Sequence, residues 1–205
     1  MRYLKSIIIF TLFSSSIFAS SQQTPAQNLS NLLNQFTTLQ AQFTQKTTSA
    51  HNTLLQHSNG TVMIKRPGQF RFETLKPEHQ IVITNGNDLW VYDVALKQAT
   101  KQSLQNSPMN PATLLSGNVN TLLQQFTVRF NQHSDLSVFQ LIPKKNHQQF
   151  RSIIIAFSHE KLSSIQIQNN LNQTTQFTFS HIKLNAHLSP SLFYFNAPSG
   201  VDVLR

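Results

Sequence analysis

The side chains that could catalyse a reaction are few and widely spaced. The seven carboxylates form no evident pair on one element, and the eight histidines lack the regular spacing of metal ligands. The sequence contains neither a Gly-x-Ser-x-Gly nucleophile turn nor a His-Glu-x-x-His helix. It has no cysteine, which excludes thiolate metal sites and a cysteine nucleophile. These patterns argue against an enzyme and predict no catalytic residue, no metal site and no cofactor.

One cationic side chain, Arg66, stands where a predicted strand meets a turn among large apolar residues. The sequence Arg66-Pro67-Gly68-Gln69 has proline and glycine at the second and third positions of a type II turn. A residue before proline also favours extended backbone. A guanidinium carries five N–H donors in a fixed plane and can bind several acceptors at once. The residues alone leave two alternatives open for this arginine, exposure to water or contact with an anion.

The segment that contains Arg66, residues 60–92, predicts four short antiparallel strands. Its apolar residues fall into four groups separated by turn signals, one of which is the hairpin dipeptide Asn85-Gly86. The groups are Val62–Ile64, Phe70 with Phe72, Ile81–Ile83, and Leu89–Tyr92. Before this segment, Thr53–Leu55 is a further candidate strand, followed by an expected turn at Asn59-Gly60.

The C-terminal half returns to alternating apolar and polar residues. Short strands separated by polar turns are expected within 126–131, 138–142, 153–157, 165–167 and 177–184. Such a succession predicts an antiparallel sheet and not βαβ units. No internal repeat and no linker is evident, so residues 20–205 are expected to form a single domain.

Three helices are expected beside the sheet. From Asn28 onward, with Asn28 or Ser30 as the N-cap, apolar residues recur at spacings of three, four and seven. This stripe consists of Leu29, Leu32, Leu33, Phe36, Leu39 and Phe43. Residues 108–117 begin with proline and end with glycine, which predicts a short helix, and residues 119–125 predict another. Both are too short to be stable alone and must lie on the sheet.

Residues 1–19 have the features of a cleavable signal peptide. Arg2 and Lys5 form a basic start, residues 7–13 an apolar middle, and Ala19 a small residue at the cleavage site. A spanning helix needs about 20 apolar residues, so this run is too short; a buried N-terminal helix is the alternative. We expect an exported protein beginning near Ser20, located in the periplasm if the cell is Gram-negative.

The chain is strongly basic. Its formal net charge is +9, or +7 without Arg2 and Lys5. A basic exported protein suits anionic lipid headgroups, lipopolysaccharide or an acidic protein partner. Basic residues occur as dipeptides at most, which argues against nucleic acid.

Several motifs share their order and spacing with a known family. They are Lys65–Phe72, Asn85–Asp93, Gln98–Thr100, Pro111–Leu115 and Pro198–Val203. Together they resemble the periplasmic outer-membrane lipoprotein carrier family, LolA, from about Leu29 onward. Two positions differ: Phe72 stands where the family often has tryptophan, and Val94 where a proline commonly follows the Tyr-Asp pair.

The resemblance implies an α+β, β-dominated fold: an incomplete, half-open antiparallel β-barrel covered by an N-terminal amphipathic helix and short lid helices. A hydrophobic cavity for acyl chains would lie between the helices and the sheet. Alternation assigns residues to the cavity, although a shift of one residue would invert a strand. The expected cavity residues are Leu32, Phe36, Leu39, Phe43, Leu114 and Leu115 on helices, and Val62, Ile64, Phe70, Phe72 and Trp90 on strands.

In the same way, Arg66 matches the family's arginine that binds lid carbonyls in the closed form. The implied function is that of a soluble, monomeric periplasmic carrier without a cofactor. It would take acylated lipoproteins from an inner-membrane lipoprotein-releasing ABC transporter to an outer-membrane lipoprotein receptor. The missing cysteine argues against the lipid-anchored receptor itself. The alternatives are a lipid-sensing or protein-interaction module on the same scaffold, and a hydrolase, which would need clustered acids.

Overall fold

The computed structural model describes residues 23–103, 111–145 and 150–204. The expected signal peptide, residues 1–19, lies outside this part. The described elements follow one another along the chain as α1 (Pro25–Asn34), β1 (Thr38–Thr48), β2 (Leu54–Lys65), β3 (Gln69–Lys76), β4 (Gln80–Asn85), β5 (Asp88–Asp93), β6 (Gln98–Ser103), α2 (Pro111–Ser116), α3 (Val119–Leu123), β7 (Phe126–His133), β8 (Leu136–Pro143), β9 (Phe150–Ser158), β10 (Lys161–Asn169), β11 (Thr174–Leu184), the 3-10 helix η2 (Pro190–Phe193) and β12 (Asp202–Leu204).

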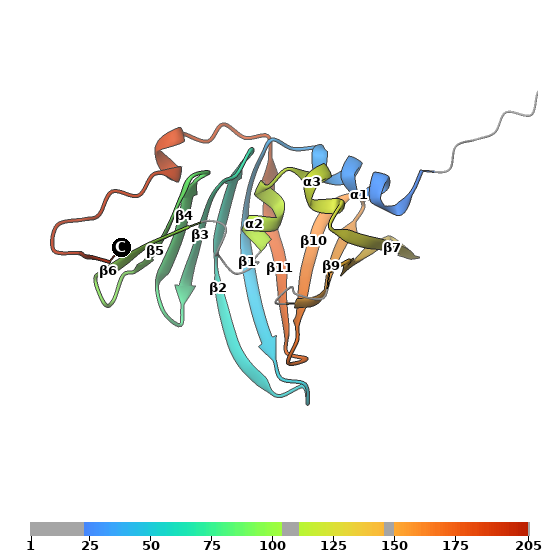
Figure 1. Cartoon of the computed structure of the whole chain (residues 1–205), viewed down its shortest axis with the longest axis horizontal. Helices are drawn as coiled ribbons and strands as arrows, with labels where there is room; N and C mark the ends of the chain where they lie inside the picture. Colours follow the sequence, from blue (N-terminus) through green and yellow to red (C-terminus); the bar gives the residue numbers. More distant parts are fainter. Residues whose placement is uncertain (1–22, 104–110, 146–149, 205) are drawn as a thin grey trace, which may run out of the picture.

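The described strands form one curved sheet of twelve strands that does not close. Their order is β12-β6-β5-β4-β3-β2-β1-β11-β10-β9-β8-β7. Neighbouring strands are antiparallel except for the β12–β6 pair, which is parallel. Helices α1, α2 and α3 lie over one face of the sheet (Figure 1). The prediction of an incomplete antiparallel barrel covered by helices is confirmed.

Helix α1 begins earlier than the sequence analysis predicted. Thr24 is its N-cap, and Pro25 occupies the first turn. The Thr24 hydroxyl accepts a hydrogen bond from the Gln27 backbone, while the Gln27 side chain accepts one from the Thr24 backbone. This reciprocal capping box stabilises the first turn. Asn28 and Ser30, the expected caps, lie inside the helix.

Helix α1 also ends earlier, and the predicted stripe continues as a strand. Leu39 and Phe43 were assigned to the helix but lie on β1. Their spacing of four also fits alternation, because Leu39, Ala41 and Phe43 point to one face and are all buried. The β-branched Thr37 and Thr38 favour extended backbone at the point where the pattern is ambiguous. The prediction of a helix through Phe43 is wrong.

The expected turn at Asn59-Gly60 is wrong as well, since β2 runs straight through it. Gly60 lies opposite Phe43 across the β1–β2 pair. A Cβ atom at Gly60 would stand 1.9 Å from the Glu73 carbonyl oxygen and 2.8 Å from the Phe43 ring. Glycine is needed here because neighbouring atoms approach its backbone closely, not because the chain turns.

Other predicted elements are confirmed. The four strands of residues 60–92 are β2 to β5, and the alternating segments of the C-terminal half are β7 to β11. The two short helices are α2 and α3, although residues 108–110 of the first prediction lie outside the described part. Strands β6 and β12, at one end of the sheet, were not predicted. Within the described residues, no helix is both long and apolar enough to cross a membrane.

The contact between Gly60 and Phe43 predicts a stability effect. Substitution Gly60→Ala forces β2 and β3 apart or displaces the Phe43 ring, so we expect unfolding free energy to fall by roughly 1–3 kcal/mol. Urea denaturation followed by circular dichroism measures this. Gly117→Ala is the matched control, because its added Cβ would meet an atom only at 3.4 Å. Equal stability of the two variants would contradict the packing described for β2.

Candidate functional site

The turn between β2 and β3 reaches the helices through its backbone. The Arg66 backbone N–H donates to the Thr37 carbonyl at 2.9 Å, and the Gly68 N–H donates to the Ser116 carbonyl at 2.8 Å. Gly68 has a φ of +74°, which a residue with a side chain rarely adopts. Proline and glycine therefore shape a turn that contacts both the segment after α1 and the end of α2.

The Arg66 side chain joins the same two helices. Its Nε donates to the Leu115 carbonyl of α2 at 2.8 Å. Its Nη1 donates to the Leu33 carbonyl of α1 at 2.6 Å and to the Phe36 carbonyl at 3.4 Å. The guanidinium carbon also lies 4.3 Å from the centre of the Phe36 ring, within the range of a cation–π contact. One cation thus links α1, the segment that follows it, and α2.

These carbonyls suit a cation for a simple reason. The last carbonyls of a helix have no partner within the helix, and the helix dipole places partial negative charge there. Leu33 is in the last turn of α1, and Leu115 in the last turn of α2. The sequence offers no acidic or basic side chain in either last turn to compete. Arg66 therefore supplies the positive charge for two helix ends.

Burial has an electrostatic cost for Arg66. Removal from water lowers the pKa of its guanidinium to about 10, so the side chain remains charged at neutral pH. Its Nη2 is buried and has no hydrogen-bond partner among the described residues. Arg66 thus donates to three carbonyls, but one of its donor groups, Nη2, has no acceptor among the described residues.

The predicted cavity residues come together beneath the helices, with one exception. Ten of them share a single apolar cluster, in which Leu32 packs against the buried members. They are Leu32, Phe36, Leu39, Phe43, Val62, Ile64, Phe70, Phe72, Leu114 and Leu115. Phe43 and Phe72 stack with ring centres 4.3 Å apart, and Phe177 meets both rings edge-on at 6.0 Å. The space between the helices and the sheet is therefore filled by side chains at its centre.

Trp90 is the exception, and its predicted position in the cavity is wrong. Its ring packs on Phe195 at 5.2 Å, and it pairs across strands with Ile83, on the other face of the sheet. Leu89, one residue earlier, is the buried member of the cluster, opposite Thr84. Because side chains alternate along a strand, the error is a shift of one residue. The C-terminal segment that covers Trp90 gave no signal of that position in the sequence.

The sequence analysis also missed residues that complete the apolar face. Leu29 and Leu33 of α1 were recognised as apolar but not assigned to the cavity, and Phe177 and Phe179 of β11 were recognised only as strand residues. All four belong to the same cluster. The available signal was their spacing, four residues on the helix and two on the strand. Spacing alone does not tell which face of the sheet the helices cover.

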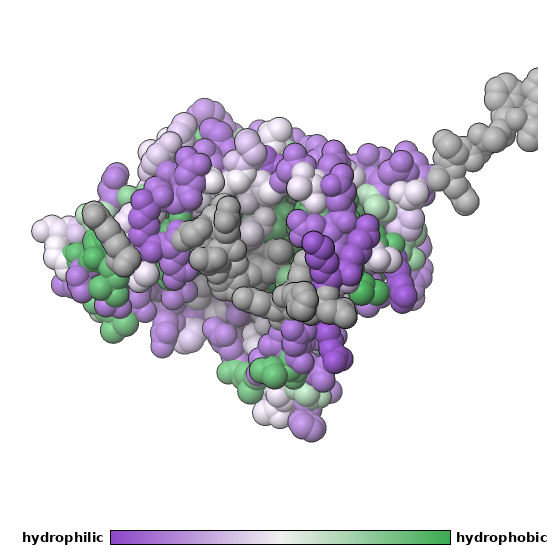
Figure 2. Space-filling model, viewed as in Figure 1, coloured by the Kyte–Doolittle hydropathy of each residue, from purple (hydrophilic) through white to green (hydrophobic). Residues whose placement is uncertain are grey.

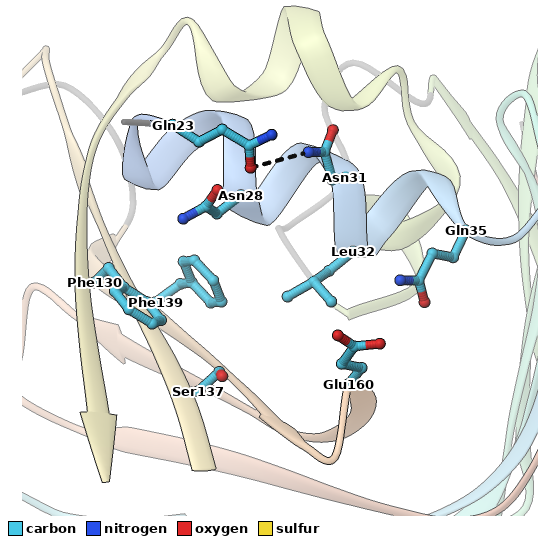
Figure 3. Close-up of a pocket in the computed structure, with 9 residues that line it drawn as sticks. All are labelled: Gln23, Asn28, Asn31, Leu32, Gln35, Phe130, Ser137, Phe139 and Glu160. Carbon is cyan, nitrogen blue, oxygen red and sulfur yellow. Dashed lines mark hydrogen bonds between the residues drawn. The ribbon is translucent and has the colours of Figure 1, made fainter. Parts of the chain in front are cut away.

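A groove opens at the edge of this cluster, beneath α1. Its apolar lining is Leu32, Phe130 and Phe139, and Glu160 lies across the groove from the two phenylalanines (Figure 3). Amide side chains of α1 and the preceding residues border it, with Asn31 donating to Gln23 at 3.5 Å. Its volume of about 280 Å³ lies below the roughly 300–1,000 Å³ of most ligand pockets.

The described residues show no arrangement that could hold a metal ion. In residues 23–103, 111–145 and 150–204, no three histidine, aspartate or glutamate side chains come together as a possible site. The site is therefore an apolar interior beneath α1 and α2, both of which accept hydrogen bonds from Arg66.

Comparison with known proteins connects this arrangement to a family. Residues 34–196 match the family described as outer membrane lipoprotein carrier protein LolA. A protein from Coxiella burnetii named outer-membrane lipoprotein carrier protein is 46% identical over 196 residues, covering 95% of this chain and 93% of that protein. A protein of the same name from Legionella pneumophila is 35% identical over 200 residues, 97% of each chain.

Solved structures agree on the fold. An uncharacterised conserved protein from Thermus thermophilus gives a TM-score of 0.57 at 13% identity, covering 89% of this chain and 99% of that one. A LolA superfamily protein from Nitrosomonas europaea gives a TM-score of 0.50 at 12% identity, with 84% and 99% covered. With a family match over residues 34–196 and relatives at 46% and 35% identity over nearly its whole length, the chain belongs to the outer membrane lipoprotein carrier protein family, LolA.

Proposed function

We propose that this protein is a periplasmic carrier that encloses the acyl chains of lipoproteins between its sheet and the helices α1 and α2. The single observation that carries the proposal is the set of hydrogen bonds from Arg66 to α1 and α2 across an apolar interior. The names of the relatives as outer-membrane lipoprotein carriers support it. Residues 1–19 would be the export signal, removed from the mature protein.

The cargo site is the apolar cluster itself. Helices α1 and α2 would swing away from the sheet, so that acyl chains replace helix side chains such as Leu33 and Leu115 against the strands. Side chains such as Phe43, Phe72 and Leu89 remain on the sheet and would form the floor. The empty protein thus fills its own binding site with its lid, and the cargo competes with the lid for the same surface.

We call the hydrogen bonds from Arg66 to α1 and α2 the latch. Their free energy is of the size that such a competition requires. Each methylene of an acyl chain contributes roughly 0.8 kcal/mol on burial, so an unopposed cavity would hold cargo too tightly to release. A hydrogen bond to a charged donor contributes about 1.5–3 kcal/mol. The unpaired Nη2 of Arg66 offsets part of this by about 1–3 kcal/mol. The closed state therefore gains free energy comparable to the burial of a few methylenes.

This balance gives the carrier a direction. Loading would require a donor that does work to open the lid, for which an inner-membrane lipoprotein-releasing ABC transporter is the proposed partner. Closing of the lid around Arg66 would then help to release cargo to an outer-membrane lipoprotein receptor. We place the protein between these two partners as a monomer, with no reaction catalysed.

The latch predicts that α1 and α2 open more often without Arg66. In Arg66→Leu we expect amide hydrogens of α1 and α2 to exchange at least about fivefold faster, because local opening sets exchange rates. Amides of β1 and β2 should stay protected. Arg71→Leu is the matched control, since the Arg71 side chain forms an ion pair with Glu73 on the same strand, β3. Unchanged exchange in the Arg66 variant would show that other contacts hold the lid.

Delivery of cargo should also depend on Arg66. Arg66→Leu keeps the interior apolar, so it should still accept lipoprotein from donor membranes, while transfer to the receptor should fall at least about tenfold, the equivalent of ~1.4 kcal/mol. Arg66→Lys keeps the charge but loses the planar set of donors and should be intermediate. Both steps are measured with purified donor and acceptor membranes. Wild-type delivery by Arg66→Leu would reject the latch.

A further inference from the structure

The hairpin of β1 and β2 extends beyond β3, the strand that pairs with β2. Pairing between β2 and β3 ends at Asn59 and Lys76, so residues 54–58 have a described strand neighbour only in β1. The hairpin projects past the rest of the sheet at its lower end (Figure 1). The β10–β11 turn lies beside it, because Thr48 pairs with both Leu54 and Thr174. Two hairpin ends therefore form one projection.

This projection carries three exposed leucines, which we call the leucine tip. Leu54 is 54% exposed, Leu55 51% and Leu171 74%. Figure 2 shows apolar side chains gathered at this lower end. By contrast, the four turns at the opposite end of the sheet contain no large apolar residue except Pro67; they are residues 66–68, 86–87, 134–135 and 159–160. These four turns therefore lack the exposed leucines of the leucine tip.

The leucine tip is apolar on both sides. Leu54 and Leu55 are consecutive strand residues, and consecutive side chains point to opposite faces of a sheet. Both are nevertheless exposed, as is every residue from His51 to His57. A groove in a protein partner would cover one face of such a hairpin, whereas the acyl region of a bilayer surrounds it. The geometry therefore favours immersion over one-sided docking.

The charge behind the leucine tip fits an anionic surface. Residues 44–58 and 166–178 contain no aspartate or glutamate, while Lys46 and His57, which face each other across the β1–β2 pair, are exposed. At about 3.3 Å per strand residue they lie roughly 10 Å behind Leu54, the depth over which interfacial segments meet headgroups. One carboxylate, Glu78, lies near Gln56, close in sequence to Lys76.

We propose that the leucine tip inserts into the interface of a membrane that contains anionic lipids, with Lys46 at the headgroups. Leu54 is the first residue of β2, and Arg66 directly follows its last residue, so the two lie at opposite ends of this strand. Docking by the leucine tip therefore leaves the lid and its latch outside the bilayer. This surface would hold the protein at a membrane between encounters, without involving the cargo site.

The test measures co-sedimentation of the cargo-free protein with phosphatidylglycerol-containing vesicles and with pure phosphatidylcholine vesicles. The protein used must lack residues 7–13, because that apolar stretch would itself bind vesicles. Mass spectrometry verifies its absence. We expect binding that is stronger with phosphatidylglycerol. The triple variant Leu54→Ser, Leu55→Ser and Leu171→Ser should bind at least about tenfold more weakly, and Lys46→Gln about fivefold more weakly only where the lipid is anionic.

Leu96→Ser is the matched control. Leu96 is 72% exposed on the β5–β6 turn, away from the leucine tip, so this variant should bind like the wild type. Equal binding by the triple variant and the wild type overturns the proposal, as does equal loss in the Leu96 variant. Absence of vesicle binding by the wild type also overturns it and leaves a protein partner for this surface. No cargo is present, so the outcome is independent of lipoprotein delivery.

Discussion

The rest of the structure depends on one partly buried cation that satisfies two helix ends. Arg66 brings Leu33, Phe36 and Leu115 to one point through their carbonyls, and neither α1 nor α2 has a charged residue of its own at that end. With six residues, α2 is too short to hold its shape alone. Helices α1 and α2 are therefore stabilised by packing on the sheet and by this arginine, and the proposed opening requires both sets of contacts to be replaced.

The sheet supplies the surface that makes such a lid useful. It stays open between β12 and β7, so its concave face is covered by helices and not by further strands. Gly60 leaves room for the Phe43 ring beside β2, where it stacks on Phe72. On the opposite face, the C-terminal segment covers β3 to β5 with Phe193 and Phe195.

Much of this could be predicted from local sequence, because period-two alternation and turn dipeptides specify β2 to β5 and β7 to β11. The errors lie where one pattern fits two structures. Leu39 and Phe43 suit a helix and a strand equally, and the choice depends on pairing with β2 and β11. Trp90 and Leu89 differ by one residue, and only the covering segment around Phe195 determines which faces the lid. The partners of Arg66 are backbone carbonyls far away in sequence, so no residue type marks them.

The most direct measurement follows the Arg66 Nε–H by nitrogen-15 NMR, in the empty protein and after a diacylated lipopeptide is added. While the Leu115 carbonyl accepts this bond, its proton should exchange slowly with water. Once acyl chains displace the lid, exchange should become at least about tenfold faster, as expected for a group released from a closed state. A proton that exchanges rapidly in the empty protein, or equally slowly with and without the lipopeptide, would contradict the account.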